Sequence, residues 1–493
     1  MLRLHNRKSH CAEPARWRQR VSLAALLLAV ASLTAATSAD AQTLRQALEQ
    51  AYRTNPRLDA ERARLRATDE EVPRAQSGWL PTVQGTADFG SQRLTSRPAT
   101  TGAGDTQPKG YGINVSQPVF TGFRTVNTVR EAEAVVRAGR ENLRLVEGNT
   151  LLEAVTAYAD VVRDTALVKL REAHVSVLTL DLTAAETRRT VREVTRTDVA
   201  QARARRARAV SDLDVARANY KSSRSAYERV VGSPAGALSD PSGRPPNLPK
   251  TLDEALQIAQ RESPNVVSAQ YREQAARHAV DKIWGELLPD VRLEASYQRR
   301  NEISASIGEQ DTASISGRLS IPLYTGGETH SRVRQAKHTH VSRVQEIEQA
   351  RTEVRAQVTT AWARLASLRS QLKSDMVQVE SNLIALEGVR EEEKVGQRTL
   401  LDVLNAEQEL LGAQTQLVTT KHDLVIAAYT LISNIGRLNA ETLALADDIY
   451  DPEAHYNEVR RKWFGISITH ADGRQETVLP PGVHAGVADD PAE

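Results

Sequence analysis

Residues 43–56 read TLRQALEQAYRTNP, and residues 251–264 read TLDEALQIAQRESP. The two stretches share Thr-Leu, Ala-Leu, Ala, Arg and Pro at matching places, 208 positions apart. Further along, Leu80-Pro81 returns as Leu288-Pro289 at the same spacing. A chain that repeats its own landmarks in the same order predicts two similar halves related by a pseudo-symmetry.

The repetition continues through each half at a spacing of 204 positions. The matching pairs are Pro118-x-x-Thr121-Gly122 with Pro322-x-x-Thr325-Gly326, Asp198-Val199 with Asp402-Val403, and Gly232 with Gly436. We therefore expect a first repeat over residues 42–240 and a second over residues 251–440.

The first 41 residues have the composition of a signal peptide. A basic leader precedes the apolar run 21–36, and Ala39-Asp40-Ala41 supplies small residues for cleavage. The apolar run is shorter than the roughly 20 residues that a membrane-spanning helix needs. The only cysteine, Cys11, lies in this leader. We expect an exported mature chain that begins at Gln42 and has no disulfide, thiolate site or lipid anchor.

Each repeat ends in a long stretch without the residues that stop helices. No proline occurs between Pro118 and Pro234, or between Pro322 and Pro452. Aromatic residues make up only 4% of the chain, which is typical of long packed helices rather than of a globular core. Long helices are therefore predicted at about 124–192, 197–232, 328–395 and 400–436. In the last of these, two apolar rows repeat every seven residues, as in coiled coils: Val403, Leu410, Leu417, Leu424, Leu431 and Leu404, Leu411, Val418, Val425, Ile432.

Ahead of each helix pair lie two segments in which apolar and polar residues alternate, as in β-strands. They cover about 82–94 and 110–120 in the first repeat, and 290–302 and 312–322 in the second. The period alone fits either an ordinary half-buried sheet or membrane strands with one wet face. The export signal favours membrane strands. Four strands cannot close a barrel with room inside, so several chains would have to complete it together.

Taken in order and twice, these motifs resemble the TolC-type outer-membrane efflux and secretion proteins over nearly the whole mature chain. The motifs that carry the resemblance are the doubled Thr-Leu-x-x-Ala-Leu, the doubled Leu-Pro, QPVFTG (117–122), IPLYTGG (321–327) and VGQRTLLDVLNA (395–406). The resemblance implies a mostly α-helical homotrimer with a twelve-stranded β-barrel in outer-membrane lipid and an α-helical barrel in the periplasm.

The same resemblance implies a function. The trimer would be the passive exit duct of a type I secretion system or of a tripartite multidrug efflux pump. A periplasmic adaptor protein and an inner-membrane pump, of the ABC or proton-driven kind, would dock to it and open it. No cofactor, metal, nucleic acid or enzymatic activity is implied.

The resemblance also assigns roles to residues at the turns between paired helices, which would form the tunnel mouth. Asp402 matches an aspartate that faces the entrance, and Asn405 replaces a second acidic residue. Arg398 matches an arginine that holds the neighbouring turn, represented here by Thr197 and Asp198. Plain helix capping is the alternative role for Asp198 and Asp402, and either Thr197 or Asp198 can cap the returning helix.

Other residues of the turns are candidate adaptor contacts. Those predicted are Arg192, Glu193, Arg196, Gly396 and Thr399. Glu393 stands where some relatives have a tyrosine in the closing contact. Arg192 stands where the family usually has glycine, which puts the geometry of that turn in question. Trp79 is a candidate anchor at the membrane interface, with simple packing as the alternative.

Four other interpretations of the sequence have less support. Arginines 188–208 suggest a nucleic-acid arm, but in an exported helix a solvated face or adaptor contact is favoured. His338 and His340 point to different helix faces and have no completing ligand. A periplasmic coiled-coil scaffold without channel activity remains the alternative function, and an exported enzyme would lack a combination of nucleophile, base and orienting residue.

Residues 441–493 are predicted to be a tail that packs around the middle of the rod up to about 464 and is partly disordered beyond 465.

Overall fold

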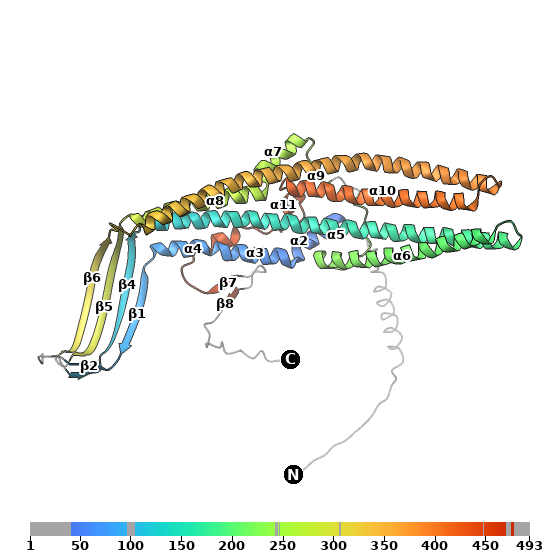
Figure 1. Cartoon of the computed structure of the whole chain (residues 1–493). Helices are drawn as coiled ribbons and strands as arrows, with labels where there is room; N and C mark the ends of the chain where they lie inside the picture. Colours follow the sequence, from blue (N-terminus) through green and yellow to red (C-terminus); the bar gives the residue numbers. More distant parts are fainter. Residues whose placement is uncertain are drawn as a thin grey trace, which may run out of the picture.

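The computed structural model describes residues 41–95, 104–241, 245, 247–304, 307–446, 448–469 and 475–477, so the predicted signal peptide lies outside it except for Ala41. The protein is an elongated rod with an antiparallel sheet at one end and two helix–helix turns at the other (Figure 1). Helices α5 (Arg124–Thr190) and α9 (Glu328–Lys394) each contain 67 residues. At about 1.5 Å per residue, each is roughly 100 Å long.

Two shorter helices return from the far turns and stop near the middle of the rod. These are α6 (Arg196–Val231) and α10 (Leu400–Asn434). We call α5 with α6 the first hairpin and α9 with α10 the second hairpin. The two hairpins contact each other mainly through α5 and α10. The heptad rows account for this packing, because Val403, Leu404 and Leu411 are all buried.

Short helices missed by the sequence analysis complete the half of the rod nearest the sheet. They are α2 (Leu44–Thr54), α3 (Pro56–Asp69) and α4 (Glu71–Gln76) in the first repeat, and α7 (Leu252–Glu262) and α8 (Pro264–Trp284) in the second. Helix α8 packs against both α5 and α9. The doubled Thr-Leu motif is a helix start, because the side chains of Thr43 and Thr251 accept the backbone N–H three residues later.

The doubled Leu-Pro motif marks the change from helix to strand. The 3-10 turns Ser77–Trp79 and Gly285–Leu287 end at Leu80 and Leu288, whose backbones are extended. A residue before proline is pushed out of the helical region by the proline ring. The following strands therefore begin at once, at Thr82 and Asp290.

The main sheet has the strand order β1-β4-β5-β6, and all neighbouring strands are antiparallel. Its strands are β1 (Thr82–Phe89), β4 (Lys109–Phe120), β5 (Asp290–Ser304) and β6 (Ile307–Ser320). The prediction of one strand over 82–94 was wrong, because a break after Phe89 separates β2 (Gln92–Leu94), which pairs with β3 (Gly104–Thr106). The prediction that the last strand reaches residue 322 was also wrong, since Pro322 cannot donate to a ladder.

The register places like residues side by side across all four strands. Val83 pairs with Val115, which pairs with Ala295, which pairs with Ile315. One position along, the row runs through Gln84, Asn114, Ser296 and Ser314. One face of the sheet is therefore apolar and the other polar. Apolar side chains on the first face remain open in the single chain, with Ile315 79% exposed.

The main hydrophobic core lies at the middle of the rod, where α2, α3 and α7 meet the long helices. Tyr158 is fully buried there, and its hydroxyl lies 2.8 Å from the carbonyl oxygen of Gln42 and 2.7 Å from that of Ser239. These contacts hold the start of the first repeat against the linker that follows α6. Of the described helices, none is both long enough and apolar enough to cross a membrane.

The tail after Leu438 lies against the first repeat near the middle of the rod. It contains α11 (Ala440–Leu443) and α12 (Ala454–Val459). The backbone N–H of Tyr450 donates to the hydroxyl of Tyr52 at 3.1 Å, and His455 lies 3.0 Å from the buried carboxylate of Asp69. Beyond residue 465, where disorder was predicted, the structure has paired strands β7 (Ser467–Thr469) and β8 (Gln475–Thr477).

Candidate functional site at the helix tips

The two turns at the far end of the rod have the same backbone geometry. In the first, the N–H groups of Arg192 and Glu193 donate to the carbonyls of Arg189 and Arg188, both at 3.0 Å. In the second, Gly396 and Gln397 donate to Glu393 and Glu392, both at 2.9 Å. Both α5 and α9 therefore end with the same pair of backward hydrogen bonds, which satisfies carbonyls at the helix end.

Arg192 occupies a backbone conformation that normally belongs to glycine. Its φ is 68°, and the equivalent Gly396 has φ 76°. The turn after α5 therefore keeps its geometry without a glycine, because Arg192 itself adopts the left-handed conformation. For a residue with a Cβ this costs on the order of 1–2 kcal/mol.

Reciprocal capping boxes start both returning helices. The side chain of Thr195 accepts from the N–H of Asp198, and the Asp198 carboxylate accepts from the N–H of Thr195 at 2.8 Å. Thr399 and Asp402 repeat the arrangement, with the carboxylate 3.0 Å from the Thr399 nitrogen. The prediction that Thr197 caps this helix was wrong, because the residue before the helix is Thr195. Asp198, the third residue inside the helix, takes part in the cap through its carboxylate.

These hydrogen bonds also favour the charged form of Asp402. Its carboxylate accepts from the backbone and the hydroxyl of Thr399, with Arg398 nearby, and the pKa of Asp402 is lowered from its ordinary value. The residue therefore carries a full negative charge at neutral pH. Capping does not prevent a second role, because the side chain lies at the exposed end of the rod.

Two polar contacts join the first hairpin to the second near the tips. Arg188 of α5 donates to Glu393 of α9 at 2.5 Å, and Arg205 of α6 donates to Asn405 of α10 at 2.8 Å. Both arginines belong to the basic run that was predicted to be a solvated face or an adaptor contact, and these two contacts were not predicted. The partners lie 205 and 200 positions apart, so no local pattern indicates them.

The remaining predicted tip residues are exposed. Within the chain Arg398 donates to Glu392 of its own turn at 2.8 Å, and not to Thr197 or Asp198. Its predicted contact with a neighbouring turn stays a prediction about the assembly. The side chains of Glu193, Arg196 and Thr399 are exposed at the same end, together with Arg192.

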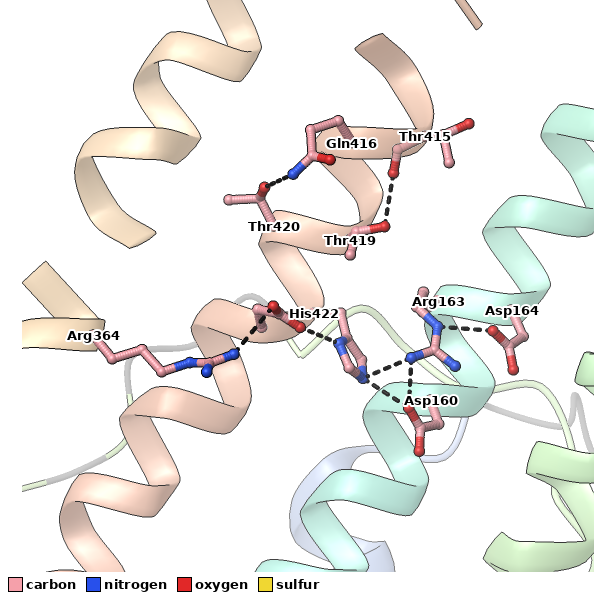
Figure 2. A network of polar contacts seen from close by, with 10 residues as sticks. Asp160, Arg163, Asp164, Arg364, Thr415, Gln416, Thr419, Thr420 and His422 are labelled. Carbon is pink, nitrogen blue, oxygen red and sulfur yellow. Dashed lines mark hydrogen bonds and ion pairs between the residues drawn. The ribbon is translucent and has the colours of Figure 1, made fainter. Parts of the chain in front are cut away.

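A second polar network joins the hairpins further from the tips, between α5 and α10 (Figure 2). The Nε2 atom of His422 lies 2.8 Å from Asp160, and its Nδ1 atom lies 2.9 Å from Asp423. Arg163 donates to Asp164 at 2.8 Å beside this histidine. Each hairpin is therefore held to the other at more than one level along the rod.

At the opposite end, Trp79 lies where the helices meet the sheet and is 46% exposed. Trp284, which sequence analysis missed, ends α8 at the matching junction and is 51% exposed. In the part of the chain that the structure describes, no group of three or more His, Cys, Asp or Glu side chains is arranged to hold a metal ion. His340, which was considered as a metal ligand, has its Nε2 atom 2.7 Å from a carboxylate oxygen of Glu273.

Comparison with known proteins agrees with this architecture. The outer membrane efflux protein family matches residues 44–233 and 255–437, which are the two repeats. The chain belongs to the outer membrane efflux protein family. It is a family of outer-membrane channel proteins rather than of enzymes.

Among relatives, the outer membrane efflux protein BepC of Brucella suis is 38% identical over 453 residues, covering 92% of this chain and 97% of BepC. The outer membrane protein TolC of Vibrio cholerae is 25% identical over 428 residues, covering 84% of this chain and 95% of TolC. The crystal structure of the Campylobacter jejuni CmeC outer membrane channel has the same fold, with a TM-score of 0.74, 15% identity, and coverage of 85% and 89% of the two chains. The mostly helical fold with an antiparallel sheet is therefore confirmed.

Proposed function

We propose that this outer membrane efflux protein assembles as a homotrimer and is the passive exit duct of a tripartite efflux pump or type I secretion system. The observation that carries the proposal is the sheet. Apart from irregularities near Pro118 and after Asn301, its four strands keep one register, with an apolar face and a polar face, at one end of a rod of roughly 100 Å.

The sheet of a single chain is incomplete. In the described sheet, β1 and β6 each pair on one side only. An unpaired edge in lipid leaves backbone groups without hydrogen bonds, each at a cost of several kcal/mol. Three chains placed edge to edge supply twelve strands, which close a barrel wide enough for a water-filled lumen. The apolar face then contacts lipid, and Trp79 and Trp284 lie near the interface.

The helical rods continue the same wall into the periplasm. Three first hairpins and three second hairpins alternate around the ring, so that the tips form its inner mouth. The three copies of Asp402 form one ring of carboxylates at that mouth. The three copies of Asn405 form a second ring, of neutral amides, where the family has a second acidic residue. Arg398 reaches from its exposed turn toward Thr197 and Asp198 of the next chain. An adaptor protein docks to the exposed residues around Arg192 and Gly396 and couples the duct to its inner-membrane pump.

The proposal is tested with two substitutions at adjacent positions of β6. Ile315 is on the apolar face and Ser316 on the polar face. Ile315→Arg places a charge in lipid and costs roughly 2–4 kcal/mol near the bilayer centre. Ser316→Arg leaves the charge in the wet lumen. We expect Ile315→Arg to reduce the protein recovered from outer membranes and Ser316→Arg to be recovered normally.

Native mass spectrometry and planar-bilayer recording complete the test. The unsubstituted protein is expected to be a trimer in detergent and to conduct ions. A monomer that does not conduct, with equal recovery of both variants, would instead support a periplasmic scaffold.

A further inference from the structure

Two acidic side chains from different hairpins meet just behind the tips. Asp181 lies on α5 and Glu407 on α10. Glu407 is 5% exposed, and one of its carboxylate oxygens accepts from Arg390 at 2.5 Å. Its other oxygen, Oε2, is buried and has no hydrogen-bond donor, and the same is true of Oδ2 of Asp181. Leu178 and Leu404, each three residues before one of the two acids, belong to one buried cluster, so both acceptors without a donor lie at the same seam.

A shared proton satisfies both acceptors. Two ionised carboxylates repel each other, whereas a carboxyl that keeps its proton donates to the other. Burial, followed by the charge of Glu407 and a hydrogen bond to it, raises the pKa of Asp181 to about 7. The apolar cluster Leu178, Ala209 and Leu404 brings together α5, α6 and α10 beside the pair.

Charged neighbours of the pair lie on α9, α6 and α5, and Arg390 is the one whose positive charge opposes the raised pKa of Asp181. From α9, Arg390 is already bonded to Glu407, and Glu393 adds a further negative charge. From α6, Arg205 donates to the neutral amide of Asn405 and keeps its positive charge, while the positive charge that acts on Asp181 is that of Arg390. From α5, burial lowers the pKa of the His174 ring and so favours its neutral form.

We propose that Asp181 and Glu407 share one proton and form a carboxyl catch that holds the two hairpins of one chain together near the tips. When the proton leaves, repulsion between the two carboxylates loosens this seam. The shared proton depends only on the fold of one chain. Its effect on opening of a mouth rests on the channel function proposed above.

The direction of the pH effect follows from proton linkage. A carboxyl whose pKa is raised in the closed seam stabilises that seam fully below its ordinary pKa, and the contribution is lost as pH rises through about 7. When the hairpins separate, Asp181 is in water and is ionised at both pH 6 and pH 8. The ratio of closed to open seam is therefore expected to fall about tenfold between pH 6 and pH 8.

Infrared spectroscopy of the purified full chain detects the shared proton without any need for conduction. We expect a protonated-carboxyl band that disappears as pH rises from 6 to 8. Asp181→Asn, whose amide donates permanently to Glu407, should remove this band. Glu387→Gln is the matched control, because Glu387 is an exposed acid on α9 outside the seam, and it should keep the band. A band that survives in Asp181→Asn and in Glu407→Gln overturns the carboxyl catch.

Planar-bilayer recording tests the effect on opening. Open probability should rise about tenfold from pH 6 to pH 8 in the unsubstituted protein and in Glu387→Gln, and stay low and flat in Asp181→Asn. If the infrared titration is present but the open probability does not follow it, the catch does not control opening. If the protein never conducts while the infrared titration persists, the channel function fails and the shared proton stands.

Discussion

Replacement of Arg192 by glycine should stabilise the first tip turn. Arg192 has φ 68° and the equivalent Gly396 has φ 76°, although the turns are otherwise alike in their hydrogen bonds. Glycine adopts this left-handed conformation without a steric clash, because it has no Cβ.

The size of the effect follows from two opposing terms. Relief of the left-handed conformation is worth about 1–2 kcal/mol. The greater freedom of glycine when the turn opens removes about 0.4–1 kcal/mol of that gain. The net stabilisation of the turn is about 1 kcal/mol, which corresponds to about a fivefold smaller population of the opened turn.

Native-state hydrogen exchange at the backbone amides of positions 192 and 193 measures this opening. Arg192→Gly should slow exchange there about fivefold. The reciprocal Gly396→Arg should accelerate exchange at positions 396 and 397, and amides in the middle of α5 should not change in either variant. Unchanged or faster exchange in Arg192→Gly would show that the left-handed conformation carries no strain.

Three further outcomes are expected. Tyr158→Phe removes the hydroxyl that lies between the carbonyls of Gln42 and Ser239, of which only the Gln42 carbonyl keeps the backbone N–H of Ser239 as a donor. The substitution should lower the free energy of unfolding by about 1–3 kcal/mol, seen as a lower thermal midpoint. Arg188→Ala breaks the contact with Glu393 between the hairpins and should raise resting conductance in bilayers. Arg189→Ala, at a neighbouring exposed position, should leave the conductance unchanged. Equal conductance in the two variants would contradict the role of Arg188 in holding the hairpins together. Asp402→Ala should raise resting conductance or alter cation block, and Asp402→Asn, which keeps a capping oxygen, separates loss of the charge from loss of the cap. Because the pKa of Asp402 is lowered, the cation block that depends on its charge should persist from neutral pH down through the ordinary aspartate range. The block should be lost only in stronger acid.

Patterns that depend on neighbours in the chain predicted the elements well. Missing prolines and heptad rows indicated the long helices, and alternation indicated the strands, to within a few residues at most ends. The short helices α2–α4 and α7–α8 were missed, although Thr43 and Thr251 are ordinary helix caps. The doubled Thr-Leu motif was interpreted only as evidence of two repeats, although it also indicates the start of a helix.

The tip contacts show the limit of this approach. Thr195 with Asp198 and Thr399 with Asp402 are three residues apart, and such pairs can be read directly as capping boxes. The bonds between Arg188 and Glu393, and the meeting of Asp181 with Glu407, join different hairpins. A charged side chain in a long polar stretch gives no indication of which distant residue it will face.

By itself, the amino-acid order determined the two repeats, the lengths of the helices, the alternating strands and the points where one changes to the other. These depend on dihedral preferences, capping and burial periodicity, which act over a few residues. The packed rod alone decided that α8 fills the space beside α5 and α9, and that particular charges meet across the seam between hairpins. Such contacts depend on the relative rotation and axial position of helices about 70 residues long, which are set only when all their apolar faces pack together.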